Sequence, residues 1–394
     1  MQIHALRNRT RPEVAIVALY IVIAIVISLQ HTVGRANTNN FIIFRASFWH
    51  LLHGQDLYAW YLAEHWDLFK YSPTTALLLA PFAILPFGIS LFCWTVLSAL
   101  ALTLSLLALM PGRAGVAALL IVLLEAIGSM QMAQSNTLVA ALMILSLVAL
   151  EHQRIAAGAT AVIVGASIKL FPLSAGLFGL LTPMRWRHVA WCTIIGIVFV
   201  LLPLLVTSPA QLQMQYHSWF VLQEQDATKT GMAWLGGIIE LALGHAIPHR
   251  PVQLFGVAII LVAAWFARDK WHDAVVRRLL LASLLIFSVV FNHMAESPSF
   301  VIAFAGIGIW WASLPSERWR DALVLMIVLL GSVGGSDIVP RHIREVWHGR
   351  IQLKAIVTLL GWFALQYDLI QRLRVPARAA LDPYVRDMQP ATRS

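Results

Sequence analysis

Long apolar runs, separated by short polar or basic segments, follow one another along almost the whole chain. Allowing for tilt and for short re-entrant pieces, each is long enough to cross the roughly 30 Å hydrocarbon core of a bilayer. They fall near residues 14–30, 74–110, 115–131, 136–150, 155–171, 171–183, 188–207, 251–267, 279–292, 298–314, 321–335 and 352–371. The pattern predicts an all-α polytopic membrane protein with about 12 transmembrane or re-entrant helices.

Prolines interrupt two of these runs. Pro81 and Pro86 lie within residues 74–110, and Pro172 lies within residues 155–183. A bilayer tolerates broken backbone only where protein or a wet cavity covers it. We therefore expect broken or re-entrant helices and a cavity next to them.

The segment after the first apolar run has a different pattern. Large apolar side chains recur there at spacings of three and four, at Phe41, Phe44, Phe48, Leu51 and Leu52. Arg45 and His53 interrupt this face, and Gly54 ends it. Such a pattern is typical of a helix that lies flat in a membrane interface. We expect this helix on the outer side, within a polar loop that covers residues 31–73.

Composition and charge agree with a membrane protein. The chain is 59% hydrophobic, carries a net charge of +9, and has a mean hydropathy of +0.75. Its cations lie in short loops, so the positive-inside rule explains them better than nucleic-acid binding. With the N-terminus inside, 18 of the 28 Lys and Arg residues fall on the inner side, which predicts two cytoplasmic termini. We expect one transmembrane domain over residues 1–373 and a basic cytoplasmic tail over residues 374–394.

The remaining polar chemistry gathers on the predicted outer face. Ten of the 14 histidines map there, with the turn QSN at 134–136 and the turn NHMAES at 292–297. Lys169, Asn292 and Glu296 directly adjoin apolar runs, where a charged or amide group is costly unless it faces a cavity. These three residues are therefore candidates for function.

Carboxylates and cations of the outer loop form a second group of candidates. Glu64, Asp67 and Lys70 come just before a proline-broken run, and Tyr71 follows them. They are either a solvated ion pair on a short helix or groups held near lipid phosphates and sugars. Asp56 follows Gly54, where it caps the next helix or takes part in chemistry.

The other candidates also have two interpretations. Lys169, followed closely by Pro172, either extends toward the interface or holds a phosphate. Gln134 and Asn136 either cap a turn or bind a ligand, and Asn292, His293 and Glu296 leave the same choice. Glu125, in an apolar run, is compatible with a hydrogen bond to a neighbouring helix. No histidine spacing suited to zinc and no nucleotide-binding motif is present, so we predict neither metal nor cofactor.

In this order, the motifs resemble those of glycosyltransferase family 87, bacterial membrane transferases that use polyprenyl-phosphate sugars. The resemblance rests on GQDLY at 54–58, FKYSPTTALLLAPFAILP at 69–86, Trp94, QSN at 134–136, GASIKLFPL at 165–173 and RWR at 185–187. It covers the first half of the chain well and the rest in topology. It implies a GT-C-like fold, a lipid-linked sugar donor, an extracytoplasmic active site and a location in the cell membrane.

The chain departs from this family at one position. Family members commonly carry an aspartate soon after the first span, which the resemblance implies is the catalytic base, but here the stretch reads NTNNFIIF with Asn39 and Asn40. An amide cannot accept a hydroxyl proton at neutral pH. The replacements available on the outer face are Asp67, Asp56, Glu64 and Glu296, and we favour Asp67.

The sequence thus predicts a transferase that moves a sugar, such as mannose, from a polyprenyl phosphate to a lipid or glycan acceptor. Asp67 is the expected base and Lys169 the phosphate ligand, helped by Arg45 or Lys70. The expected substrate-binding residues are Asn39, Asn40, Arg45, Lys70, Tyr71, Gln134, Asn136, Lys169, Asn292 and His293. A flippase or other transporter for lipid-linked saccharides is the alternative, and a structural subunit is a third interpretation.

Overall fold

The computed structural model describes residues 10–34, 38–227 and 233–374. Within these ranges the chain forms helices, turns and loops, with no strand. The tail predicted over residues 374–394 lies outside the described residues except for Arg374. The all-helical class predicted from the apolar runs is confirmed.

Most of the described helices follow one another with short connections, but a long loop over residues 53–72 separates α3 from α4. The longer ones are α2 (Arg11–Thr32), α3 (Asn39–Leu52), α6 (Phe87–Leu109), α7 (Arg113–Gln131), α8 (Asn136–Glu151), α9 (Ile155–Ile168), α11 (Arg185–Leu201), α12 (Pro209–Asp226), α14 (His249–Ala267), α15 (Ala274–Val290), α16 (Phe300–Ala312), α17 (Arg318–Ile327) and α19 (Leu353–Arg374). The short ones are α4 (Pro73–Leu78), α5 (Ala80–Ile84), η1 (Phe171–Gly176), α10 (Leu177–Leu180), η2 (Leu202–Leu205), α13 (Leu235–Leu243), η3 (Arg268–Lys270), η4 (Ser297–Ser299), η5 (Val328–Val333), α18 (Arg341–Arg344) and η6 (Glu345–Arg350).

Among the described residues, six helical stretches are long and apolar enough to cross a membrane. They are Arg11–Thr32, Phe87–Leu109, Arg113–Gln131, Arg185–Leu205, His249–Lys270 and Leu353–Arg374. Shorter apolar helices cover Asn136–Glu151, Ile155–Ile168, Phe171–Leu180 and Ser297–Ala312. The protein is thus a helical membrane protein.

Both predicted helix breaks are present. The run from residue 74 to 110 divides into α4, α5 and α6, with Pro81 in the first turn of α5 and Pro86 directly before α6. After α9 the chain is extended at Lys169 and then turns through η1, which contains Pro172. Gly165 allows this turn to pack closely, because a Cβ atom there would lie 2.9 Å from Pro172.

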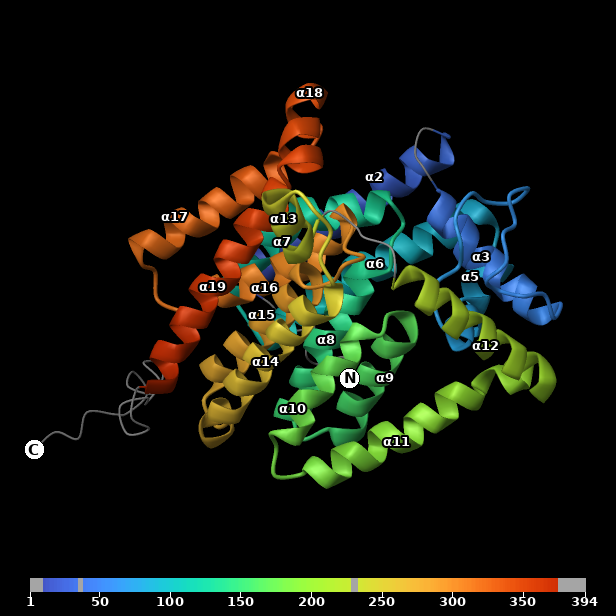
Figure 1. Ribbon diagram of the computed structural model, residues 1–394, viewed down its shortest axis with the longest axis horizontal. Coiled ribbons are helices and arrows are strands. Elements are labelled where there is room, and N and C mark those ends of the chain that lie inside the picture. The colour runs from blue at the N-terminus through green and yellow to red at the C-terminus, as the bar shows by residue number, and fades with distance from the viewer. Residues whose placement is uncertain (1–9, 35–37, 228–232, 375–394) are drawn as a thin grey trace, which may run out of the picture.

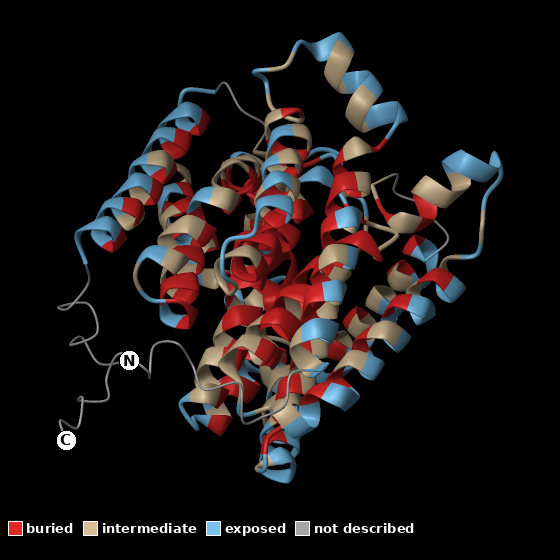
Figure 2. Ribbon diagram, turned by 90° about the vertical axis from the view of Figure 1, so that its left-hand side faces the viewer, coloured by how far each residue is buried: buried red, intermediate tan, exposed pale blue. Residues whose placement is uncertain are grey.

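The buried residues form a large central core (Figure 2) and a second, smaller core. In the central core α16 packs against α7 and α15, and α19 packs against α15. The smaller core joins α3 to the loop of residues 53–72 and to Trp94 of α6.

The predicted helix after the first span is confirmed as α3, and Gly54, with a φ of +70°, follows its end. Phe41, Phe44 and Leu51 on its apolar face are buried. In Figure 1 the helix lies beside α5 and α12, at the opposite side of the molecule from α17 and α19. Helix α12 is joined to the 53–72 loop by Gln215, whose side chain accepts a hydrogen bond from the Leu57 amide and donates one to the Gln55 carbonyl.

Candidate functional site

Lys169 is at the centre of a group of polar side chains near one end of α8 and α9. It follows the last residue of α9, and its Nζ atom donates a 2.6 Å hydrogen bond to Oδ1 of Asn136. Asn136 begins α8 and is buried. The sequence predicted both residues as binding candidates, and the structure brings them into contact.

The segment after Lys70 is held against the same helix ends. The Ser72 amide and the Thr75 hydroxyl both donate to the Ser167 carbonyl, at 3.2 and 2.7 Å, just before Lys169. The Ser135 hydroxyl donates to the Tyr71 hydroxyl oxygen at 3.3 Å. These bonds place Lys70 and Tyr71 beside the 134–136 turn.

The 134–136 turn has a constrained backbone. Ala133, which precedes it, has a φ of +49°, a left-handed conformation that costs a residue with a Cβ atom roughly 1–2 kcal/mol. Its carbonyl accepts a 3.1 Å hydrogen bond from Nε1 of Trp94, which holds the turn in place. Gln134 then reaches the 292–297 turn, where its Nε2 atom donates to Oε2 of Glu296 at 3.4 Å.

Charges of both signs surround Lys169. Glu296 is exposed, and both it and Lys70 lie close enough to act electrostatically on the Lys169 ammonium. Tyr71 lies within the electrostatic range of Glu296 and of Asp67. Burial raises the pKa of the Tyr71 phenol to about 12, so this hydroxyl keeps its proton at neutral pH.

Asp67 is at the outer edge of this group. Its Oδ1 atom accepts a 2.7 Å hydrogen bond from the Leu68 amide and lies 3.9 Å from Nζ of Lys70. Its side chain is 37% exposed, so the carboxylate is open to solvent. Lys70 also lies 4.0 Å from Oδ2 of Asp226, at the end of α12. The predicted pairing of Asp67 with Lys70 is present.

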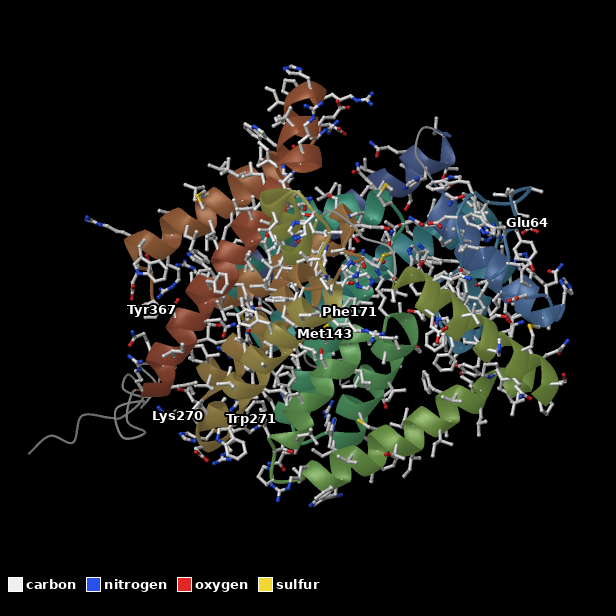
Figure 3. The ribbon with its side chains drawn as sticks, in the orientation of Figure 1. Glu64, Met143, Phe171, Lys270, Trp271 and Tyr367 are labelled. Atoms are coloured by element: carbon white, nitrogen blue, oxygen red, sulfur yellow. The ribbon has the colours of Figure 1, made fainter. Side chains whose placement is uncertain are left out.

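The other two carboxylates of the 53–72 loop, Asp56 and Glu64, make contacts elsewhere. Asp56 accepts hydrogen bonds from the Tyr58 amide at 3.0 Å and from the Ser218 hydroxyl at 2.9 Å. The prediction that Asp56 caps a helix is wrong, because no helix begins at this position. The residue closes a turn instead and joins that turn to α12. Glu64 contacts Nε2 of His50 at 3.2 Å, and Figure 3 shows it far from Phe171, which is close to Lys169 in the chain.

Three predicted binding residues of α3 make contacts that position the helix. Arg45 donates to the carbonyl oxygens of Phe82 and Ala83 at the end of α5 and to that of Leu85. Oδ1 of Asn39 accepts a 3.0 Å hydrogen bond from the Trp66 amide. Nδ2 of Asn40 donates a 2.9 Å hydrogen bond to the Met132 carbonyl.

Asn292 and His293 also make local contacts. Oδ1 of Asn292 accepts a 3.0 Å hydrogen bond from the Met294 amide. The His293 ring contacts Nε2 of Gln253 through Nδ1 at 3.0 Å and the Asp226 carbonyl through Nε2 at 3.3 Å. An amide NH₂ can only donate and a carbonyl can only accept, so Nε2 carries the ring proton.

Two residues near the site were not singled out from the sequence. Asp226, which faces Lys70, ends the polar helix α12, whose sequence gives no sign of this partner. Lys354 of α19 donates to Oε2 of Glu125 at 2.8 Å and to the hydroxyl of Ser297 at 3.1 Å. It thereby joins α7 and α19 to the residue that follows Glu296.

The buried histidines predict a loss of stability in acid. Burial lowers the pKa of His50, and Glu64 partly opposes this shift. Burial also lowers the pKa of His293; the neighbouring His249 lowers it further, and Asp226 partly opposes the shift. Each folded-state pKa lies below the unfolded value of about 6.5, so this stability is complete above about pH 6.5 and is lost as the pH falls through the folded values. We expect the thermal unfolding midpoint in detergent to fall between pH 6.5 and 5.

A matched comparison identifies the groups responsible. Replacing both residues, His50→Gln and His293→Gln, should reduce the pH dependence of the midpoint, and the remainder should come from His348, whose pKa is also lowered by burial. His152→Gln, at an exposed histidine, should leave it as in the wild type. A double variant as sensitive to acid as the wild type would assign the effect to other groups.

These features define a membrane protein with a polar site at one end of an apolar helical bundle. A family model described as glycosyltransferase family 87 matches residues 69–292, more than half of the chain, and the chain belongs to this family. The matched part includes Lys70, Tyr71, the 134–136 turn, Lys169 and Asn292. A search of curated proteins finds no significant match.

Proposed function

We propose that the protein transfers a sugar, such as mannose, from a polyprenyl-phosphate carrier to a lipid or glycan acceptor at the extracytoplasmic face of the cell membrane. One observation carries this proposal. In a family 87 chain, a group of polar side chains gathers at the end of an apolar bundle, and it consists of the cations Lys169 and Lys70, the carboxylates Asp67 and Glu296, and the amides Gln134 and Asn136. The proposal includes a GT-C-like arrangement of about 12 membrane crossings with both termini in the cytoplasm.

The residues of the group suit the parts of such a reaction. A departing phosphate needs cations, which Lys169 and Lys70 supply through charge-assisted hydrogen bonds. The acceptor hydroxyl needs a base, and Asp67 is a partly exposed carboxylate beside Lys70. Gln134 and Glu296 have hydrogen-bonding groups suited to sugar hydroxyls. The side-chain cations can hold a phosphate leaving group without a metal ion.

In this proposal three residues of α3 position the site and take no part in the reaction. Asn40 fixes α3 against Met132, Arg45 fixes it against the broken helices, and Asn39 fixes it against the loop at Trp66. A helix fixed there forms a lip over the site, past which a lipid carrier enters from the side. The asparagines at the position of the family's aspartate thus contribute to structure, and the base is at Asp67.

The test is sugar transfer by the purified protein, reconstituted with a polyprenyl-phosphate sugar and an acceptor lipid. Lys169→Gln removes the charge but retains a group that can hydrogen-bond to Asn136. A hydrogen bond to a charged group contributes about 1.5–3 kcal/mol, so we expect transfer to fall roughly 10- to 150-fold. Lys169→Arg should retain part of the activity, because the charge remains.

Arg113→Gln is the control, because Arg113 is an exposed cation that lies away from the site. It begins α7, whereas the 134–136 turn follows the opposite end of that helix. It should leave transfer unchanged. Wild-type-like activity in both Lys169 variants would contradict the phosphate role. Movement of the lipid-linked sugar across the bilayer, with no new glycosidic bond in the wild type, would favour the flippase alternative.

A further inference from the structure

A cavity with several charged residues in its lining is present in the protein, away from the candidate site. Its volume is about 1000 Å³, and its lining includes Glu151 at the end of α8, Arg185 at the start of α11, and Arg268, Trp271 and Arg277. Helix α8 begins at Asn136 in the candidate site, and its 16 residues span about 24 Å. In Figure 3 Trp271 of this cavity lies well apart from Phe171, which follows Lys169 closely.

The lining of this cavity carries an excess of positive charge. Three arginines and one glutamate line it, which leaves a net charge of +2. Arg277 contacts Glu151 at 2.8 Å, so this pair is internally neutral. Arg185 and Arg268 are exposed, and Arg268 stacks 3.6 Å from the Trp265 ring. The exposed ion pair of Arg268 with Asp269, at 3.4 Å, is of a kind that contributes little.

An apolar chamber continues from this basic cavity into the bundle. It has a volume of about 370 Å³ and shares the lining residues Leu177, Leu180 and Leu261 with the larger cavity. Its other walls include Val257 of α14 and Phe287 of α15. A basic mouth joined to an apolar interior matches the two parts of a lipid, a charged headgroup and a hydrocarbon chain.

A buried polar atom lies on the wall of the chamber. His188 is 1% exposed, and its Nδ1 atom has no hydrogen-bond partner among the described residues. Its Nε2 atom is 3.4 Å from the sulfur of Cys192. Because this nitrogen is itself buried, the ring packs into the wall of the chamber, against Gly179, and offers no polar contact to a hydrocarbon chain inside it.

We infer that this cavity binds an anionic phospholipid, with the headgroup phosphate between Arg185 and Arg268 and an acyl chain in the apolar chamber. A soluble anion would leave the chamber unused, and a zwitterionic lipid would not need the excess charge. A sugar donor with its phosphate at Lys169 could not place the same phosphate here, so the bound molecule is a second lipid. Basic sites between membrane helices are common places for anionic headgroups.

Native mass spectrometry of the full-length protein, incubated with equal amounts of phosphatidylglycerol and phosphatidylcholine, tests the inference without any measurement of sugar transfer. We expect preferential retention of phosphatidylglycerol. Each basic side chain near a membrane surface is worth about fivefold in affinity, so the double variant Arg185→Gln, Arg268→Gln should weaken retention on the order of 25-fold. Arg187→Gln, an exposed neighbour outside the cavity lining, should retain the lipid.

A second variant tests the chamber. Val257→Trp fills it and should weaken phosphatidylglycerol binding while Arg185 and Arg268 remain. Equal retention of the two lipids, or an Arg187→Gln effect equal to that of the double variant, would overturn the inference. Two further results would also overturn the inference. If inorganic phosphate raised the thermal midpoint as much as phosphatidylglycerol, the cavity would be an anion site only. If polyprenyl phosphate were retained in preference to phosphatidylglycerol, the cavity would be a carrier site.

Discussion

Lys354→Met should destabilise the protein by about 3–5 kcal/mol, because it leaves a buried carboxylate without its cation. Glu125 and Lys354 are both buried, and their side chains meet at 2.8 Å. The other Glu125 oxygen accepts a 2.8 Å hydrogen bond from the Ser332 hydroxyl. The unfolding midpoint in detergent measures the loss.

A double variant separates this pair from simple side-chain packing. Replacing a buried ion pair by apolar residues of similar size is often neutral, so Lys354→Met with Glu125→Leu should recover much of the stability. Because Lys354 also holds Ser297, next to Glu296, we expect the double variant to recover stability more fully than sugar transfer. A single variant as stable as the wild type, or a double variant no better than the single one, would contradict this assignment.

The sequence predicted the parts of the site that depend on local order. Four parts of the site adjoin the end of an apolar run, namely Tyr71, the 134–136 turn, Lys169 and Glu296. When successive helices run in opposite directions, such ends meet at the same end of the bundle. Proline positions marked the helix breaks, and the spacing of large apolar residues marked α3. These features are encoded within short stretches of chain, so they can be read without knowledge of the tertiary structure.

Hydrogen-bond partners could not be predicted in the same way. Lys354 and Glu125 are separated by 229 positions, and helical periodicity shows which face is buried but not what that face meets. Arg45 was expected near phosphate, yet it caps the carbonyl groups of a broken helix whose position depends on the fold. Asp56 had the local pattern of a cap, but its second oxygen is engaged by Ser218, 162 positions away.

Asp67→Asn should lower the rate of sugar transfer by roughly 10²–10⁴, the range of a general base, while leaving the protein folded. The physical reason is that an amide cannot take the acceptor proton, whereas its shape and its hydrogen bond to the Leu68 amide can be retained. The measurement is turnover at saturating donor, with the unfolding midpoint recorded for the same preparation.

Asp56→Asn is the matched control, because its carboxylate closes a turn and binds α12 through Ser218. It should cost about 1 kcal/mol of stability and leave turnover largely intact. The competing carboxylate is Glu296, which shares the surroundings of Lys169 and Tyr71. If Asp67→Asn retains turnover and Glu296→Gln abolishes it, the base is Glu296. If neither change, nor Glu64→Gln, lowers transfer, none of these three carboxylates is the base, and the proposed role of Asp67 is wrong.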